Sequence, residues 1–66
     1  MDYYVTCVRD NGRTILSQHR DKESAMVAGK TAWMNAQKGD LISVIQANVD
    51  ENNQVVGKYT LYQSWM

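Results

Sequence analysis

Cysteine, proline and net charge are scarce or absent in this sequence of 66 residues, and each shortage excludes a class of protein. The single cysteine, Cys7, excludes an internal disulfide and a cysteine-rich zinc site, and it suits a reducing compartment. Proline and low-complexity stretches are missing, so no linker divides the chain and we expect one domain over residues 1–66. Seven basic residues balance seven acidic ones, so no global field draws the protein to nucleic acid or to an anionic membrane.

Long apolar runs are also missing. No run approaches the roughly 18 apolar residues that are needed to span a bilayer. Residues 1–6 contain an acid and two tyrosines, whereas a secretory signal has a basic segment followed by an apolar one. We therefore expect a cytoplasmic protein that makes no contact with membranes.

The small size of the chain favours association with other chains. A short domain buries a comparatively small fraction of its unfolded surface, so oligomerisation often supplements its core. The charges are unevenly placed, with a net +3 between Arg9 and Lys38 and a net −3 between Gly39 and Gly57. This arrangement allows complementary contact between copies, although a mixed, solvated surface is the ordinary explanation. We expect a homodimer or a higher oligomer.

A β-hairpin is predicted near the N-terminus. Residues 3–8 and 14–17 are strand-like, and they flank Asp10-Asn11-Gly12, where Asn and Gly tolerate positive φ. The turn is either the pair Asn11-Gly12 or a three-residue loop from Asp10 to Gly12 with glycine at the bulge. We favour the three-residue loop, which pairs Cys7 with Ile15 and places both on one face.

A helix is predicted from Asp21 to Lys38. Asp21 suits the N-cap, and Gly39 suits the position just beyond the C-cap. Small residues recur at helical spacing on the core-facing side, with Met26 and Trp33 at the edge of the stripe: Ala25, Ala28, Gly29, Ala32 and Ala36. Glycine costs about 1 kcal/mol relative to alanine in a helix interior, so we expect Gly29 to allow close approach of the helix to the sheet.

Two further strands, over residues 41–49 and 55–65, flank a polar turn at residues 50–54. The order predicts an α+β fold of ββαββ type, a four-stranded, mostly antiparallel sheet with the helix packed on one face. The other sheet face is then open in a monomer. We expect that face to present a set too apolar for water, namely Tyr4, Thr6, Val8, Leu16, Ile42, Val44, Thr60 and Tyr62.

No group of residues predicts catalysis or a bound cofactor. Cys7 lies in the middle of a strand, where cysteine is normally a buried hydrophobe and not an activated thiolate, and His19 lies between strand and helix. One histidine and one cysteine give no metal-ligand spacing, and residues 50–54 lack the glycine and glutamate of a calcium loop. The four glycines are dispersed and form no phosphate-binding loop. We predict no catalytic residue, no metal, no cofactor and no enzymatic activity.

The predicted function is stoichiometric binding by a small module that regulates or inhibits a larger protein and associates with itself. The expected contact residues come from the open sheet face, the outer side of the helix and the C-terminus: Tyr4, Thr6, Thr60 and Tyr62; Val27 and Met34; and Trp65 with Met66. One alternative is a single-stranded nucleic-acid-binding protein that stacks bases on Tyr4 and Tyr62 beside Lys58, although the neutral charge makes nucleic acid an unlikely partner. Another is an enzyme whose site forms only between subunits.

Overall fold

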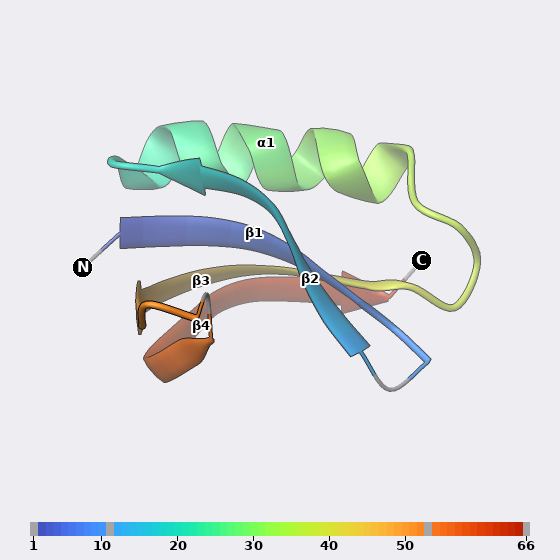
Figure 1. The fold of residues 1–66 in the computed structure, drawn as a ribbon. Coiled ribbons are helices and arrows are strands. Elements are labelled where there is room, and N and C mark those ends of the chain that lie inside the picture. The colour runs from blue at the N-terminus through green and yellow to red at the C-terminus, as the bar shows by residue number, and fades with distance from the viewer. Residues whose placement is uncertain (1, 11, 53, 66) are drawn as a thin grey trace.

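The computed structural model describes residues 2–10, 12–52 and 54–65, and its elements follow the predicted order ββαββ. The elements are β1 (Asp2–Arg9), β2 (Gly12–His19), α1 (Lys22–Met34), β3 (Leu41–Val49) and β4 (Val55–Trp65). All neighbouring strands are antiparallel, in the order β2-β1-β3-β4, and α1 lies across one face of the sheet (Figure 1). The predicted α+β fold is confirmed.

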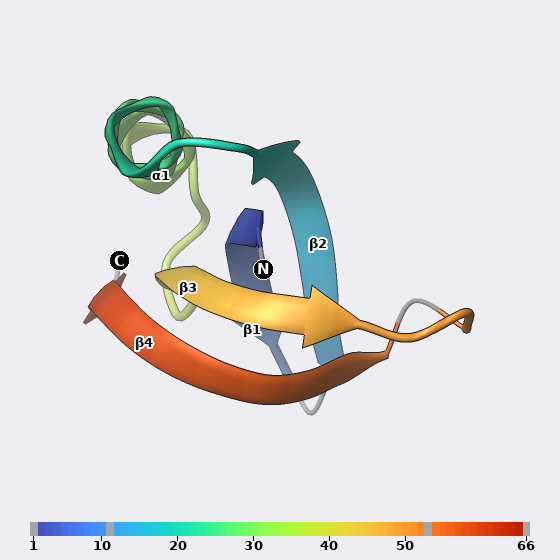
Figure 2. The same ribbon diagram turned by 90° about the vertical axis from the view of Figure 1, so that its left-hand side faces the viewer.

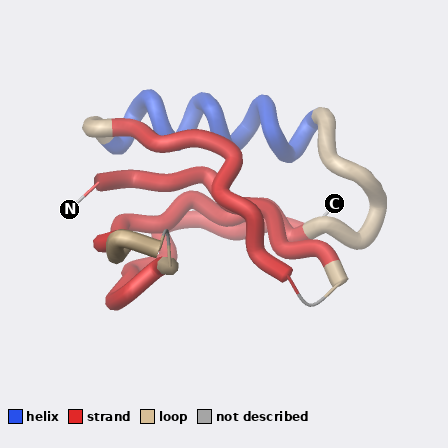
Figure 3. The backbone as a smooth tube through the Cα atoms, in the orientation of Figure 1, coloured by secondary structure: helices blue, strands red, loops and turns tan. Residues whose placement is uncertain are grey.

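The helix-side core is built from alternate residues of the two central strands and the small-residue stripe of α1. Its buried members are Val5, Cys7, Ala25, Ile42 and Val44, and Tyr3, Met26, Ala28, Ala32, Trp33 and Ala36 pack against them. Gly29 is where the helix comes closest to the sheet, because a Cβ added there would lie 2.5 Å from Cγ2 of Val44. The predicted close approach is therefore confirmed, and Figure 3 shows α1 running along the sheet.

The predicted end of the helix is wrong by one turn. The start is as expected, because the Asp21 carboxylate accepts a hydrogen bond of 2.9 Å from the Ser24 backbone N–H. The helix ends at Met34, and Asn35 is the C-cap, whose side chain donates to the Thr31 carbonyl at 2.9 Å. An asparagine side chain that bonds to the backbone competes with helix continuation. Gly39, with φ of 97°, lies in the connection to β3.

The predicted register of the first hairpin is also wrong. Arg9 lies opposite Gly12, so residues 10 and 11 form the connection, and Asp10 adopts the left-handed φ of 55°. Asn11 lies outside the described residues. Cys7 pairs with Thr14, while Ile15 lies opposite Thr6 and so faces away from the helix. Aspartate tolerates the left-handed region, so Asp10 takes the positive φ that was expected of Gly12, and the turn is one residue shorter than the favoured loop.

Bulges coil the sheet. The pairing skips Leu16 in β2, and it skips Gly57 and Leu61 in β4. Gly57 has φ of 67°, a conformation that glycine adopts without strain. Figure 2 shows the resulting twist, with β2 turned steeply away from β4.

The second sheet face is consequently less open than expected. Tyr4 and Thr6 lie on it but are buried, with Tyr4 only 7% exposed. Tyr4 packs with Ile45, Ala47, Ile15 and Val49 in a second core. The guanidinium of Arg13 reaches over this face and donates to the Thr6 hydroxyl at 3.4 Å.

Three members of the predicted open face belong elsewhere. Ile42 and Val44 are buried in the helix-side core, and Tyr62, opposite Val44, lies on the helix side of β4. A shift of one residue exchanges the two faces of a strand, so these assignments depended on a register that the sequence did not specify. Among the described residues, none of the helical structure is both long and apolar enough to cross a membrane.

Candidate functional site

A hollow of about 430 Å³ lies between the outer side of α1 and the strand β4. Its wall consists of Met26, Val27, Lys30 and Trp33 from the helix and Tyr62 from the strand. The hollow exists because α1 packs mainly on β1 and β3, whereas β4 is the edge strand and is only lightly covered. Helix and strand thus form two walls of a groove along one edge of the molecule.

The wall of the hollow is apolar and accessible. Val27 is 67% exposed and Tyr62 is 40% exposed, while Met26 and Trp33 are half-buried beneath them. Met34 is also exposed, and it lies on the same side of α1 as Val27 because seven residues make two helical turns. Single exposed apolar residues are ordinary, but several around one hollow mark a binding surface.

Lys30 supplies the one charge in the wall. Among the residues that the structure describes, the ion pair found joins Arg9 to Asp40, so Lys30 has no acidic partner among them. The α1 and β4 segments together carry Lys22, Glu23, Lys30 and Lys58, a net +2. The hollow itself therefore combines an apolar lining with one basic side chain, that of Lys30.

The C-terminal end of β4 is tied to the helix. The indole N–H of Trp33 donates to the backbone carbonyl of Trp65 at 3.2 Å, which holds the two walls of the hollow together. Trp65 is itself 66% exposed and is paired with Leu41, which places its side chain on the second face. The Trp65 side chain is therefore not enclosed by the described residues, and Met66 lies outside them.

The predicted contact residues that the structure describes do not form one surface. Val27 and Tyr62 meet in the hollow, and Met34 lies on the same helix side. Thr60 lies opposite Ile45 on the second face, beside the buried Tyr4 and Thr6. Tyr4 and Tyr62 are on opposite faces, so they cannot stack bases together as the nucleic-acid alternative requires.

Sequence reasoning missed two members of the site, because Met26 and Trp33 were assigned only to the edge of the core-facing stripe. Their position at the edge of the helical stripe was the available signal, because a residue at such an edge can reach both the core and the surface.

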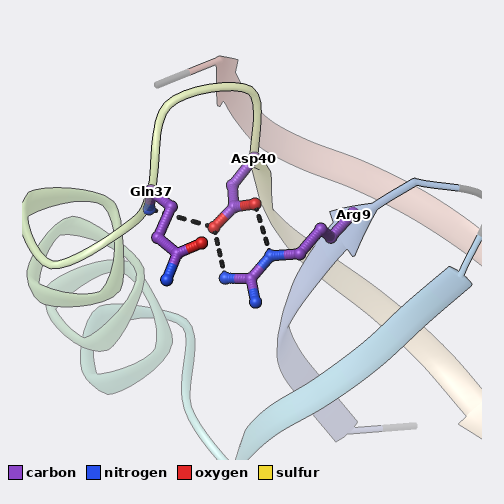
Figure 4. Close-up of polar contacts among 3 residues, drawn as sticks. All are labelled: Arg9, Gln37 and Asp40. Atoms are coloured by element: carbon purple, nitrogen blue, oxygen red, sulfur yellow. Dashed lines mark hydrogen bonds and ion pairs between the residues drawn. The ribbon is translucent and has the colours of Figure 1, made fainter.

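The best-defined polar cluster is structural (Figure 4). Nε and Nη2 of Arg9 donate to the two carboxylate oxygens of Asp40, each at 2.8 Å, and the Gln37 backbone N–H donates to the same carboxylate at 3.0 Å. The hydrogen bonds from Arg9 lower the pKa of the buried Asp40 carboxyl to about 2, against the opposing effect of desolvation. The cluster fastens the α1–β3 connection to β1, and both carboxylate oxygens are used.

Cys7 and His19 do not form a nucleophilic pair. Cys7 lies opposite Thr14, whereas His19 lies opposite Tyr3 at the other end of the hairpin and shares a 2.8 Å hydrogen bond with Ser17. Burial, followed by the negative charge of Asp40, raises the pKa of the Cys7 thiol, which disfavours the reactive thiolate. In the described part of the chain, no three His, Cys, Asp or Glu side chains gather into a metal site.

No protein-family model matches the chain, and no curated protein or solved structure is significantly similar to it. Function is inferred here from the surface of the chain itself. The hollow between α1 and β4 is the feature of that surface in which exposed apolar side chains, a cavity and an unpaired charge coincide.

Proposed function

We propose that the protein is a non-enzymatic binding module that acts stoichiometrically, as a regulator or inhibitor of a larger protein, through the hollow between α1 and β4. The observation that carries the proposal is the exposure of Val27 and Tyr62 around a cavity of about 430 Å³ whose floor is Met26 and Trp33. Aromatic residues and methionine are enriched in protein interfaces. Most binding energy in such interfaces comes from a few anchors that fill pockets.

Self-association is the second part of the proposal, and a different surface supports it. Val8, Leu41 and Trp65 lie side by side in one row across the end of the second sheet face, since Leu41 pairs with both of the others. Val8 and Leu41 are half-buried and Trp65 is exposed. A copy that covers this row would bury the most exposed tryptophan of the described chain.

Site-specific photocrosslinking tests the binding function. A photoreactive amino acid at position 27 should give one major adduct with a larger protein in the cells that produce the chain, at one copy of each. The control carries the same group at position 18, because Gln18 is exposed on β2, away from the hollow. Equal adducts from both positions, or none from position 27, would contradict the proposal.

The Val27→Asp variant gives the matching competition experiment. Excess unlabelled wild-type protein should suppress the adduct, whereas excess Val27→Asp should not, because a carboxylate in the wall would be desolvated on binding. Val27 is 67% exposed, so the substitution should leave the fold intact, which circular dichroism can verify.

A further inference from the structure

The edge of β4 that faces away from β3 has no neighbouring strand in the sheet order. Between Tyr62 and Trp65 the pairing with β3 is regular, so the backbone there is extended and its outward edge faces no other strand. The Trp65 carbonyl already accepts from the Trp33 indole, so the outward backbone groups up to Ser64 are the ones that another chain can use. This regular run begins at Tyr62, the residue through which β4 lines the hollow. A strand added at this edge would therefore lie along the groove.

The face of the sheet decides which side chains of an added strand enter the hollow. Directly opposed residues of antiparallel strands point to the same face, so the residue opposite Tyr62 would point to the helix side. There it would meet Met26, Val27 and Trp33. An apolar residue is required at that position, and the next residue on the same face lies two positions away.

Lys30 favours an added strand that carries a negative charge. It lines the hollow and has no acidic partner among the described residues. An acidic residue on the helix-side face of the added strand would pair with it, in a setting partly shielded from water by Trp33 and Tyr62. The groove therefore favours a segment that alternates apolar and acidic residues on one face.

A second copy of this chain fits the groove poorly. A two-fold contact places the same surface against itself, which would bring the Lys30 side chains of the two copies together. The bulge at Leu61 also interrupts β4 in the middle, where a symmetric β4–β4 ladder would need continuous pairing.

We propose that the site recognises an extended acidic segment of another protein, which pairs with β4 along Tyr62–Ser64 and inserts an apolar side chain into the hollow. This inference rests on the proposed binding function. It names the conformation, the charge and the anchoring residue of the bound segment. Backbone hydrogen bonds would supply affinity, and the hollow with Lys30 would supply specificity.

Selection from a phage library of random decapeptides tests the inference. Binders should be enriched in an apolar residue with Asp or Glu two positions away. A synthetic copy of the selected peptide should bind the wild-type protein in a titration followed by tryptophan fluorescence. Methylation of backbone nitrogens on the β4-facing edge should abolish binding, because it removes the donors of the added strand.

Charge reversal tests the role of Lys30. Lys30→Glu should weaken binding of the selected peptide by about tenfold or more, and replacing the acidic residue of the peptide with lysine should restore it. Lys22→Glu makes the same charge change on α1 outside the hollow, so it should alter affinity by less than about twofold.

Three results would overturn the inference. They are a library without enriched binders, a consensus that is basic, and binding by helical peptides that tolerates backbone methylation. The crosslinking experiment at position 27 tests the broader binding function independently of these three results. A fourth result would be enrichment of peptides that match the sequence of β4 itself. That result would indicate pairing between copies of this chain and would also overturn the inference.

Discussion

The buried carboxylate of Asp40 is the residue on which the connection between α1 and β3 depends. It accepts hydrogen bonds from Arg9 and from the backbone of Gln37, and the bidentate geometry suits guanidinium and carboxylate groups. Arg9 is 54% exposed, so the pair joins a buried acceptor to a partly solvated donor. Protonation of the Asp40 carboxylate at low pH should therefore weaken this cluster.

Acid should weaken the fold through Asp40. Its pKa is about 2 in the folded chain against an ordinary value of 3.8. The stabilisation is complete above the ordinary value and is lost as the pH falls through about 2. We expect the urea concentration at the midpoint of unfolding to decrease as the pH is lowered through that range. Asp40→Asn should lower this midpoint at neutral pH and should make it depend less on pH in acid.

The control for this measurement is Asp10→Asn. It removes a neighbouring carboxylate without breaking the ion pair, and asparagine tolerates the positive φ of that position. An acid response of Asp40→Asn as steep as that of the wild type would contradict the assignment.

Gly29 and Val44 fix how closely the helix and the sheet approach. The Cβ of an alanine at position 29 would lie 2.5 Å from Val44 Cγ2, and Val44 is fully buried. A β-branched side chain has little freedom to move aside. Overpacking of this kind costs about 1–3 kcal/mol, which exceeds the gain of about 1 kcal/mol from replacing glycine in a helix.

Gly29→Ala should therefore lower the free energy of unfolding by about 1 kcal/mol, measured by urea denaturation. In a Val44→Ala background the obstructing methyl group is absent, so the same substitution should become neutral or stabilising. A double-mutant cycle measures the coupling. A Gly29→Ala protein that is more stable in the wild-type background would disprove the close approach.

The elements were predictable from sequence because each carries local signals. Apolar alternation, the Asp21 N-cap and the polar turns mark the strands and the helix. A glycine inside a strand pattern is itself a signal for the bulge at Gly57. The bulges at Leu16 and Leu61 carry no comparable signal, since a bulge depends on how the whole sheet coils. The register predicted for Ile15 was wrong for another reason, because the hairpin turn has two residues and not three, and a shift of one residue moves a side chain to the other face.

The same limit applies to the site. Sequence pattern indicated Val27, Met34, Tyr62 and Trp65 as contact residues, since each is apolar and distinct from the core stripe. It could not group them, because Tyr62 reaches the hollow only if it lies on the helix side of β4. That placement follows from the register with β3, which the chain sets through tertiary packing.

At the scale of the whole molecule, the coiled sheet covers much of its own second face. For a monomer of 7.5 kDa the expected accessible surface is about 4,200 Å². The accessible surface of this fold, 4623 Å², is only slightly larger, so the fold is nearly complete without a partner. Any dimer should therefore dissociate into folded monomers.

Trp65 tests the proposed self-association. If the row of Val8, Leu41 and Trp65 is a dimer interface, Trp65→Ser should raise the dissociation constant at least tenfold, measured by light scattering over a range of concentrations. Val27→Asp should leave the dimer unchanged. A chain that is monomeric at high micromolar concentration would rule out this interface.

The antiparallel pairing of β1 with β3 also sets the order of folding. Each hairpin joins neighbouring segments, but the β1–β3 ladder runs from Asp2 opposite Ala47 to Val8 opposite Leu41. Closing that distant pair is the slow, entropically costly step, and α1 must form on the way because it spans the gap. Shortening the side chain of Val5 or Val44 to alanine should then slow refolding in stopped-flow measurements. The same kind of substitution in the outer strands should mainly speed unfolding.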